Sequence, residues 1–313
     1  MNLSSADLYL DIKTHTIVPE AQEFIPQYPL WSDGLIKKRW IYLPTNSQID
    51  TSDVNWWNFP IGTKLWKEFG YQKNGSFKRI ETRLFHREDS GWKAKTFLWN
   101  EDDTEALESS GARYEKYVDL GEGVSHSIPS TNNCMVCHRD TKGTSVILGF
   151  SALQLAHEGD GLNLTKLNQA GRLSHPLPEV IKIKSSTPHG QKAMGLLYGN
   201  CAHCHNPRGF QGRLGMNLKH DINNQNPEQE NVYLTAVNQD AFYEFPDSEV
   251  SRKRILPGDP QKSVLFRRVQ ASNHTDIYFD ERMPPGALGT MTPNKELLQS
   301  LDEWIKSLVP SIL

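Results

Sequence analysis

The sequence predicts an α+β fold, with an antiparallel sheet in the N-terminal part of the chain and helices in the C-terminal part. Residues 60–120 contain short β-branched and aromatic stretches separated by turn signals, which is the pattern of an antiparallel meander. Apolar residues recur at helical spacing near the other end, at Leu297, Leu301, Trp304, Ile305 and Leu308. Two prolines between Ser174 and Pro178 interrupt regular structure between these patterns. We therefore expect two domains, 1–180 and 181–313.

Composition sets limits on the class of protein. The chain has 313 residues, of which 37% are hydrophobic and 23% charged, and these proportions are typical of a globular protein. The net charge of −3 gives no reason to expect nucleic acid or an anionic membrane as a partner. No run of about 18 apolar residues occurs, so we expect no transmembrane segment in this chain.

The N-terminal part should consist mainly of strands. Asn74-Gly75 is a strong signal for a two-residue hairpin. Strands are expected at Lys38–Leu43, Lys64–Phe69, Ile80–Phe85, Trp92–Trp99 and Arg113–Leu120. Residues 1–58 are rich in aromatic side chains, which we interpret as core residues of the β-domain rather than as a haem-covering or docking surface.

Helices are expected after the first 140 residues. Two short ones should lie at Phe150–Glu158 and Leu162–Gln169, and a longer one at Gln191–Tyr198. Pro293 follows Thr292 at a plausible first position of the closing helix.

Two short motifs carry the chemistry. Cys134-Met135-Val136-Cys137-His138 and Cys201-Ala202-His203-Cys204-His205 share the pattern Cys-x-x-Cys-His, and together they use all four cysteines of the chain. This pattern is the attachment signature of c-type haem, in which the thiols form thioethers and the histidine binds the iron. We therefore expect two c-type haems, held by Cys134, Cys137 and His138 and by Cys201, Cys204 and His205.

Cysteine pairs of this kind also occur in zinc sites, redox-active dithiols and disulfides. A four-cysteine zinc site usually has its two pairs about 15–20 residues apart, whereas here the second pair begins 64 residues after Cys137. Redox-active dithiols are expected near a βαβ pattern, which this sequence lacks. One haem with a disulfide from the other pair is a further alternative. Neither a zinc site nor a pair of redox-active dithiols explains why a histidine follows each cysteine pair.

The C-terminal part resembles class I cytochrome c. The resemblance covers about residues 187–309 and rests on a helix that enters Cys201–His205, the late sequence Arg282-Met283-Pro284-Pro285-Gly286, and the amphipathic closing helix. It implies that Met283 is the second iron ligand, opposite His205. Residues 206–256 would then contain an insertion. Met/His ligation raises the haem potential and leaves no open position on the iron, so this haem is expected to carry electrons.

The N-terminal part resembles the cytochrome P460 and cytochrome c′-β group, which hold haem against an antiparallel sheet. The resemblance covers about residues 58–140, and its specific motif is Cys134–His138. It implies a β-sheet haem domain ahead of the class I cytochrome c domain. Enzymes of the P460 type also cross-link a lysine to the haem, but nothing in the sequence marks one lysine for that role.

The expected function is that of a two-haem c-type cytochrome, transferring electrons between a donor and an acceptor protein outside the cytoplasm. The second iron ligand at His138 stays open, with His126 as a weak candidate. If that position is vacant, the chain is instead a haem enzyme, either a P460-like oxidase or a peroxidase, or a gas-binding sensor. Met1–Ser5 lack the features of a secretory signal. Because haem attachment normally takes place outside the cytoplasmic membrane, we expect a periplasmic or other extracytoplasmic protein whose signal sequence has been removed.

Overall fold

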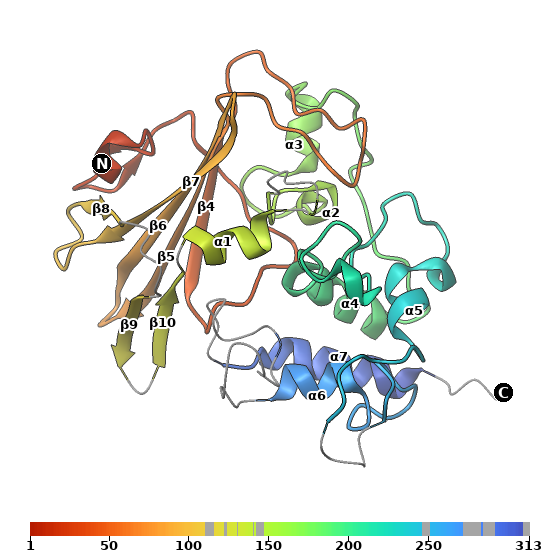
Figure 1. The fold of residues 1–313 in the computed structure, drawn as a ribbon. Coiled ribbons are helices and arrows are strands. Elements are labelled where there is room, and N and C mark those ends of the chain that lie inside the picture. Colours follow the sequence, from red (N-terminus) through yellow and green to blue (C-terminus); the bar gives the residue numbers. More distant parts are fainter. Residues whose placement is uncertain are drawn as a thin grey trace.

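The structure is a computed structural model. It describes residues 1–109, 116–121, 124–129, 131–139, 141, 147–245, 251–271, 283 and 292–308. This part of the chain combines antiparallel sheets with helices, as the sequence predicts (Figure 1). None of its helices has the length and hydropathy that crossing a bilayer requires.

A six-stranded antiparallel sheet dominates the N-terminal half. Its strands follow the order β3-β4-β5-β6-β7-β8, so each strand pairs with its neighbour in sequence. The strands are β3 (Gln22–Glu23), β4 (Ile36–Tyr42), β5 (Lys64–Lys73), β6 (Ser76–Glu88), β7 (Gly91–Trp99) and β8 (Ala106–Glu108). The predicted meander is therefore confirmed, with β5 and β6 longer than expected.

The Asn74-Gly75 hairpin is also confirmed. Lys73 pairs with Ser76, which leaves a two-residue loop, and both loop residues have positive φ, 51° at Asn74 and 78° at Gly75. These angles match a type I′ turn, whose twist suits the right-handed twist of the flanking strands.

Two smaller hairpins accompany the main sheet. They pair β1 (Tyr9–Asp11) with β2 (Thr16–Ile17), and β9 (Lys116–Gly121) with β10 (Val124–Ile128). The predicted strand Arg113–Leu120 corresponds to β9, although residues 113–115 lie outside the described residues. β9 pairs with β10 and not with β8, so β8 is an edge strand of the main sheet.

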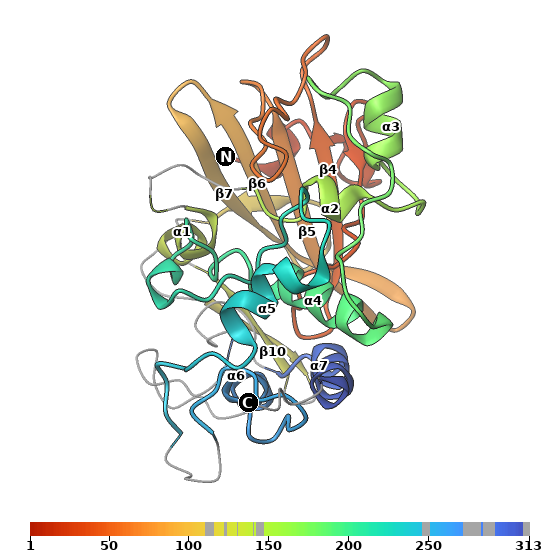
Figure 2. The same cartoon turned by 90° about the vertical axis from the view of Figure 1, so that its right-hand side faces the viewer.

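Helices follow β10 along the chain. They are α1 (Thr131–His138), α2 (Ala152–Leu155), α3 (Leu164–Gln169), α4 (Pro188–Asn200), α5 (Asn231–Ala236), α6 (Val264–Gln270) and α7 (Lys295–Ser307), with 3₁₀ turns η1 (Leu3–Ser5), η2 (Gly212–Leu214) and η3 (Pro227–Gln229). Figure 1 shows α1 between the sheet and α4, with α6 and α7 side by side below them. Figure 2 shows α7 beside α6 from a second direction.

The closing helix begins later than predicted. Asn294 is its N-cap, and the Asn294 side chain accepts a hydrogen bond of 3.1 Å from the Leu297 amide. An asparagine cap satisfies one of the free amides of the first turn, and this capping sets the start of the helix. Pro293 lies before the cap, so its prediction as the first helical residue is wrong. The apolar face is confirmed at Leu297, Leu301, Trp304 and Ile305, which are all buried.

One hydrophobic cluster joins the sheet to the helices. It contains Phe24 and Phe85 from the N-terminal half, Leu153 and Leu155 from α2, and Trp304 from α7. Phe24 contacts Phe150 at a centroid distance of 4.8 Å, in a T-shaped arrangement. Apolar packing therefore crosses the predicted boundary at residue 180. The two-domain division stays a prediction about independent folding.

Candidate cofactor site at the two Cys-x-x-Cys-His motifs

The first motif lies on α1, where Cys134, Cys137 and His138 share one helical face because they are three and four residues apart. All three side chains line a cavity of about 140 Å³. The opposite wall comes from the sheet, including Leu65 and Phe85. The imidazole of His138 packs on the ring of Phe85 at a centroid distance of 4.5 Å. Both thiols and the histidine of this motif thus open onto the same space.

The second motif follows directly on the end of α4. Cys201 is the C-cap residue, and its amide donates to the Leu197 carbonyl at 2.8 Å. The amides of Cys204 and His205 then donate to the Cys201 carbonyl at 3.1 and 2.9 Å, which folds the motif into a turn. Asn200 anchors this turn, because its side chain accepts a 2.7 Å hydrogen bond from the Trp31 amide.

The imidazole of His205 is buried, and its Nδ1 has no hydrogen-bond partner in the described part of the chain. Burial, together with smaller electrostatic effects of His203, Arg268 and Arg254, lowers the pKa of His205 to about 4. The ring is therefore neutral at physiological pH. A neutral imidazole is the form that binds a metal, so His205 fits the role of an iron ligand.

The fold brings the two motifs into contact. The Sγ atoms of Cys137 and Cys204 and a ring nitrogen of His203 all lie within 4.8 Å of one another. The hydrogen bond between the two thiols lowers the pKa of Cys137 and raises that of Cys204, and His203 also lowers the Cys137 value. The Cys137 thiol therefore loses its proton more readily than the Cys204 thiol. The resulting thiolate is the form of cysteine that attacks carbon and binds metals.

Buried charges lie behind the first motif on the sheet. Arg83 donates to both carboxylate oxygens of Glu81, at 2.9 and 2.5 Å, and His126 Nε2 lies 2.7 Å from Glu81 Oε1. Burial lowers the pKa of Arg83, but Glu81 and the nearby Cys134 and Cys137 outweigh burial and raise it. Arg83 is therefore a permanent cation beside the thiols of the first motif.

Lys67 lines the same cavity from β5. Burial and the neighbouring cations Arg39, Lys37 and Arg83 hold the pKa of Lys67 well below its usual value. Among the strand lysines whose side chains the structure describes, Lys67 is the one that lines the cavity around Cys134 and Cys137. No local pattern distinguishes Lys67 from the other lysines, because its position at the cavity depends on how β5 packs against α1.

His126, the weak candidate for second ligand at the first motif, is 1% exposed and bonded to Glu81. It is not among the residues that line the cavity around Cys134. His203 does line that cavity, although it belongs to the second motif. The sequence does not reveal this contact between the motifs.

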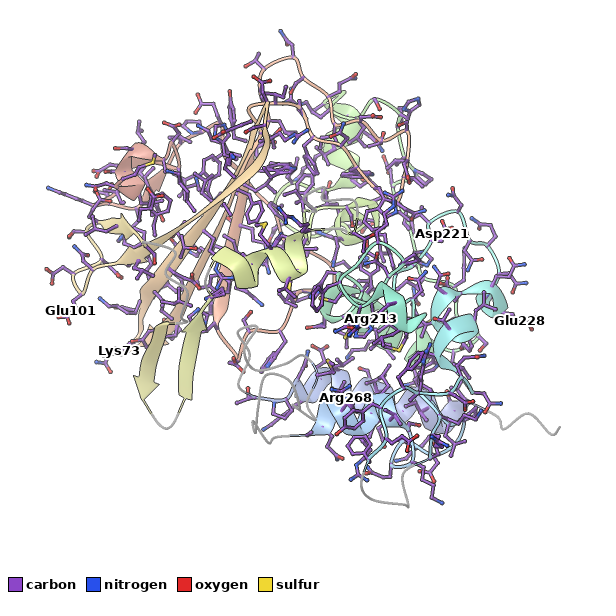
Figure 3. All side chains as sticks on the ribbon, viewed as in Figure 1. Lys73, Glu101, Arg213, Asp221, Glu228 and Arg268 are labelled. Carbon is purple, nitrogen blue, oxygen red and sulfur yellow. The ribbon has the colours of Figure 1, made fainter. Side chains whose placement is uncertain are left out.

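Met283 is partly buried, and its amide donates to the Arg268 carbonyl at 2.7 Å. Arg268 lies on α6, where Figure 3 labels it, and its charge acts on His205. Met283 is thus tied to a residue whose side chain influences the second motif. Arg282 and Pro284-Pro285-Gly286 lie outside the described residues. The role of Met283 as an iron ligand stays a prediction.

The aromatic residues of the N-terminal segment divide between two roles. Phe24 and Trp40 are buried in the core, as predicted. Trp56 and Trp57 instead line a second cavity, of about 440 Å³. This larger cavity shares six lining residues with the smaller one: Ile147, Leu148, Gly149, Gln154, Gly199 and His203.

Comparison with known proteins identifies no relative: no family model, no curated protein and no solved structure matches this chain. The site itself therefore has to carry the functional argument.

Proposed function

We propose that this chain is a two-haem c-type cytochrome that transfers electrons between redox partners outside the cytoplasm. The observation that carries the proposal is the contact between the two motifs, in which the Sγ atoms of Cys137 and Cys204 lie within 4.8 Å of each other. Two haems attached through Cys137 and Cys204 would therefore lie with one edge of each porphyrin close to the other. Short separation is what electron exchange between two carriers in one protein needs.

The residues of each motif fit the group. Cys134 and Cys137 would hold the first haem and His138 would bind its iron, since all three line one cavity. Cys201, Cys204 and His205 would hold the second. The neutral imidazole of His205 supports this assignment, because its Nδ1 has no hydrogen-bond partner in the described part of the chain. Met283 is the proposed ligand opposite His205.

One-electron transfer is the chemistry that haem supplies. The chain contributes charge and burial around it. Arg83 and Arg39 line the smaller cavity together with apolar side chains such as Leu65 and Phe85. Fixed positive charge favours the electron-richer, reduced state of a bound redox group, and apolar walls exclude water.

A second candidate function is a structural or regulatory transition-metal site. Cys137, Cys204 and His203 offer two sulfurs and a nitrogen within 4.8 Å of one another, which is a ligand set that zinc uses. The long separation in sequence argued against a shared zinc site, but the fold removes that argument by bringing Cys137 to Cys204.

The deciding experiment is production of the chain together with a haem-attachment system, followed by haem staining on a denaturing gel and measurement of intact mass. Two covalent haems are expected. Replacing Cys134 and Cys137 by Ser should remove one, and replacing Cys201 and Cys204 should remove the other. A protein that binds zinc and gains no covalent haem would support the metal site instead. Absence of both would contradict both candidates.

A further inference from the structure

The larger cavity has an unusual charge. Its volume is about 440 Å³, and four of its lining side chains are cationic: Arg87, Arg139, Arg208 and Lys219. Among the described residues that line it, there is no aspartate or glutamate. Within the described part of the chain, none of these four cations forms an ion pair with a carboxylate. A cavity with this lining attracts an anion.

Aromatic contacts hold two of the cations at the wall. The Arg208 guanidinium and the Lys219 amine each lie 4.5 Å from the centre of the Trp56 ring. Lys219 also lies 5.2 Å from the ring of Tyr198. Cation–π contacts of this kind restrict the side chains without neutralising them, so both charges stay available to a ligand.

Two buried donors in the cavity wall lack acceptors. They are Arg87 Nε and Trp57 Nε1, which have no hydrogen-bond partner in the described part of the chain. A buried donor without an acceptor is unfavourable, because it has lost its hydrogen bond to water and gained none in return. A ligand oxygen would remove this cost, and carboxylate oxygens pair well with the planar fork of an arginine.

The remaining walls suit a flat ligand. Large aromatic and apolar residues line the cavity beside the cations, including Phe59, Trp92 and Phe150. Phe59 packs edge-on against Trp92 and Phe150 at centroid distances of 5.7 and 5.9 Å. The lining therefore combines flat apolar surfaces with positive charge, which favours a planar organic anion over a small inorganic one.

We propose that this cavity binds the carboxylates of a planar organic anion. Two sources share that chemistry: the propionates of a haem attached at Cys134 and Cys137, and a free aromatic carboxylate. The first source rests on the proposed function. It is favoured because the cavity at Cys134 alone, about 140 Å³, lies below the range of roughly 300–1,000 Å³ typical of small-molecule sites. The shared lining joins it to the larger cavity.

The binding test uses 2-naphthoate as the probe and isothermal titration calorimetry as the measurement. It compares the fully haem-loaded protein with the Cys134→Ser/Cys137→Ser variant. If propionates occupy the cavity, the loaded protein binds no naphthoate and the variant binds it. If the natural ligand is a free carboxylate, the loaded protein itself binds naphthoate. In either case Arg208→Gln should weaken binding at least about tenfold.

A second readout does not depend on the probe. In the loaded protein, Arg208→Gln and Lys219→Gln should alter the pH dependence of one midpoint potential if propionates are the ligand. The matched control is Arg213→Gln, since Arg213 is exposed on η2 and does not line the cavity (Figure 3). Two results together would overturn the proposal. Neither protein would bind naphthoate, and Arg208→Gln and Lys219→Gln would change the midpoint potentials no more than Arg213→Gln does. Haem staining tests the proposed two-haem function separately, so a failure of that function can be distinguished from a failure of the anion-binding proposal.

Discussion

At the scale of single residues, Glu81 is the most consequential buried charge near the first motif. Burial raises the pKa of Glu81, but the charge of Arg83 and the hydrogen bond with His126 outweigh burial and leave the pKa at about 2. The carboxyl group is therefore ionised in the folded protein at every pH above that value. Its contacts stabilise the fold above the pKa of about 4.5 that it has when unfolded, and this stabilisation is lost as the pH falls from there toward 2.

Glu81→Gln should therefore flatten the dependence of stability on pH between about 4.5 and 2, where the ionised carboxyl contributes about 3 kcal/mol. At neutral pH the same change should destabilise the protein, because Arg83 is left buried without its partner. Urea unfolding at a series of pH values measures both effects. The control is Glu296→Gln, whose exposed ion pair with Lys192 should contribute less than about 1 kcal/mol. Equal pH profiles for the two variants would contradict the role of Glu81.

Met283→Ala tests the proposed second ligand. Loss of a thioether ligand should lower the midpoint potential of one haem and open a position on its iron. A redox titration and a spectrum with carbon monoxide measure the two consequences. Met216→Ala is a suitable control, because Met216 packs against the main hydrophobic cluster. An unchanged potential together with no carbon monoxide binding would assign the ligand role to another residue.

The motif residues could be predicted from the sequence, because Cys-x-x-Cys-His is a local pattern. Lys67 and His203 could not be assigned to the first motif, since their positions depend on packing between β5, α1 and the turn after α4. The same is true of the four cations that line the larger cavity, which come from segments separated by up to 132 residues of chain, from Arg87 to Lys219. Nothing in a one-dimensional pattern records that these side chains share a cavity.

At the scale of elements, α4 positions the second motif through a close crossing with the N-terminal segment. A Cβ atom at Gly195 would overlap the ring of Tyr28, and one at Gly199 would overlap the Tyr28 carbonyl. Both glycines therefore permit an approach that no other residue allows. Gly190 lies against a different neighbour, because a Cβ atom there would meet Ser185 and the Trp304 ring of α7.

Gly199→Ala should destabilise the protein by about 1–3 kcal/mol, because backbone atoms have to move to make room for the added methyl group. It should also disturb both cavities, since Gly199 lines each of them. Thermal unfolding measures the first effect, and the haem spectra the second. Lys192→Ala is the control on the same helix, because Lys192 is exposed and should change stability by less than about 0.5 kcal/mol. A variant as stable as this control would contradict the crowding argument.

Element types were more predictable than element limits. The Asn74-Gly75 turn and the apolar face of α7 follow from short-range chemistry, so the sequence alone was sufficient for them. The predicted start of α7 is wrong because the sequence offers two possible starts. Pro293 could be the first helical residue, but Asn294 is the N-cap. The separate pairing of β9 with β10 was not predictable either, since pairing partners are chosen by long-range contacts.

At the scale of the whole molecule, the main hydrophobic cluster connects residues from both predicted domains. Residues 181–313 produced alone would therefore expose the apolar surface that now packs on Leu153 and Leu155. We expect this fragment to bind a hydrophobic dye such as 1-anilinonaphthalene-8-sulfonate and to unfold at a lower temperature than the whole chain. A fragment with the stability of the intact protein and no dye binding would establish two independent domains.

The contact between Cys137 and Cys204 also has a consequence for biogenesis. In the closed fold these two thiols face each other, so an enzyme that modifies either one needs the chain before that closure is complete. Maturation would then have to run ahead of final folding. In an oxidising compartment the same proximity creates a hazard, because a disulfide between the two residues would block both attachment sites in a single event. A strong reductant supplied during maturation is therefore expected to raise the yield of fully loaded protein.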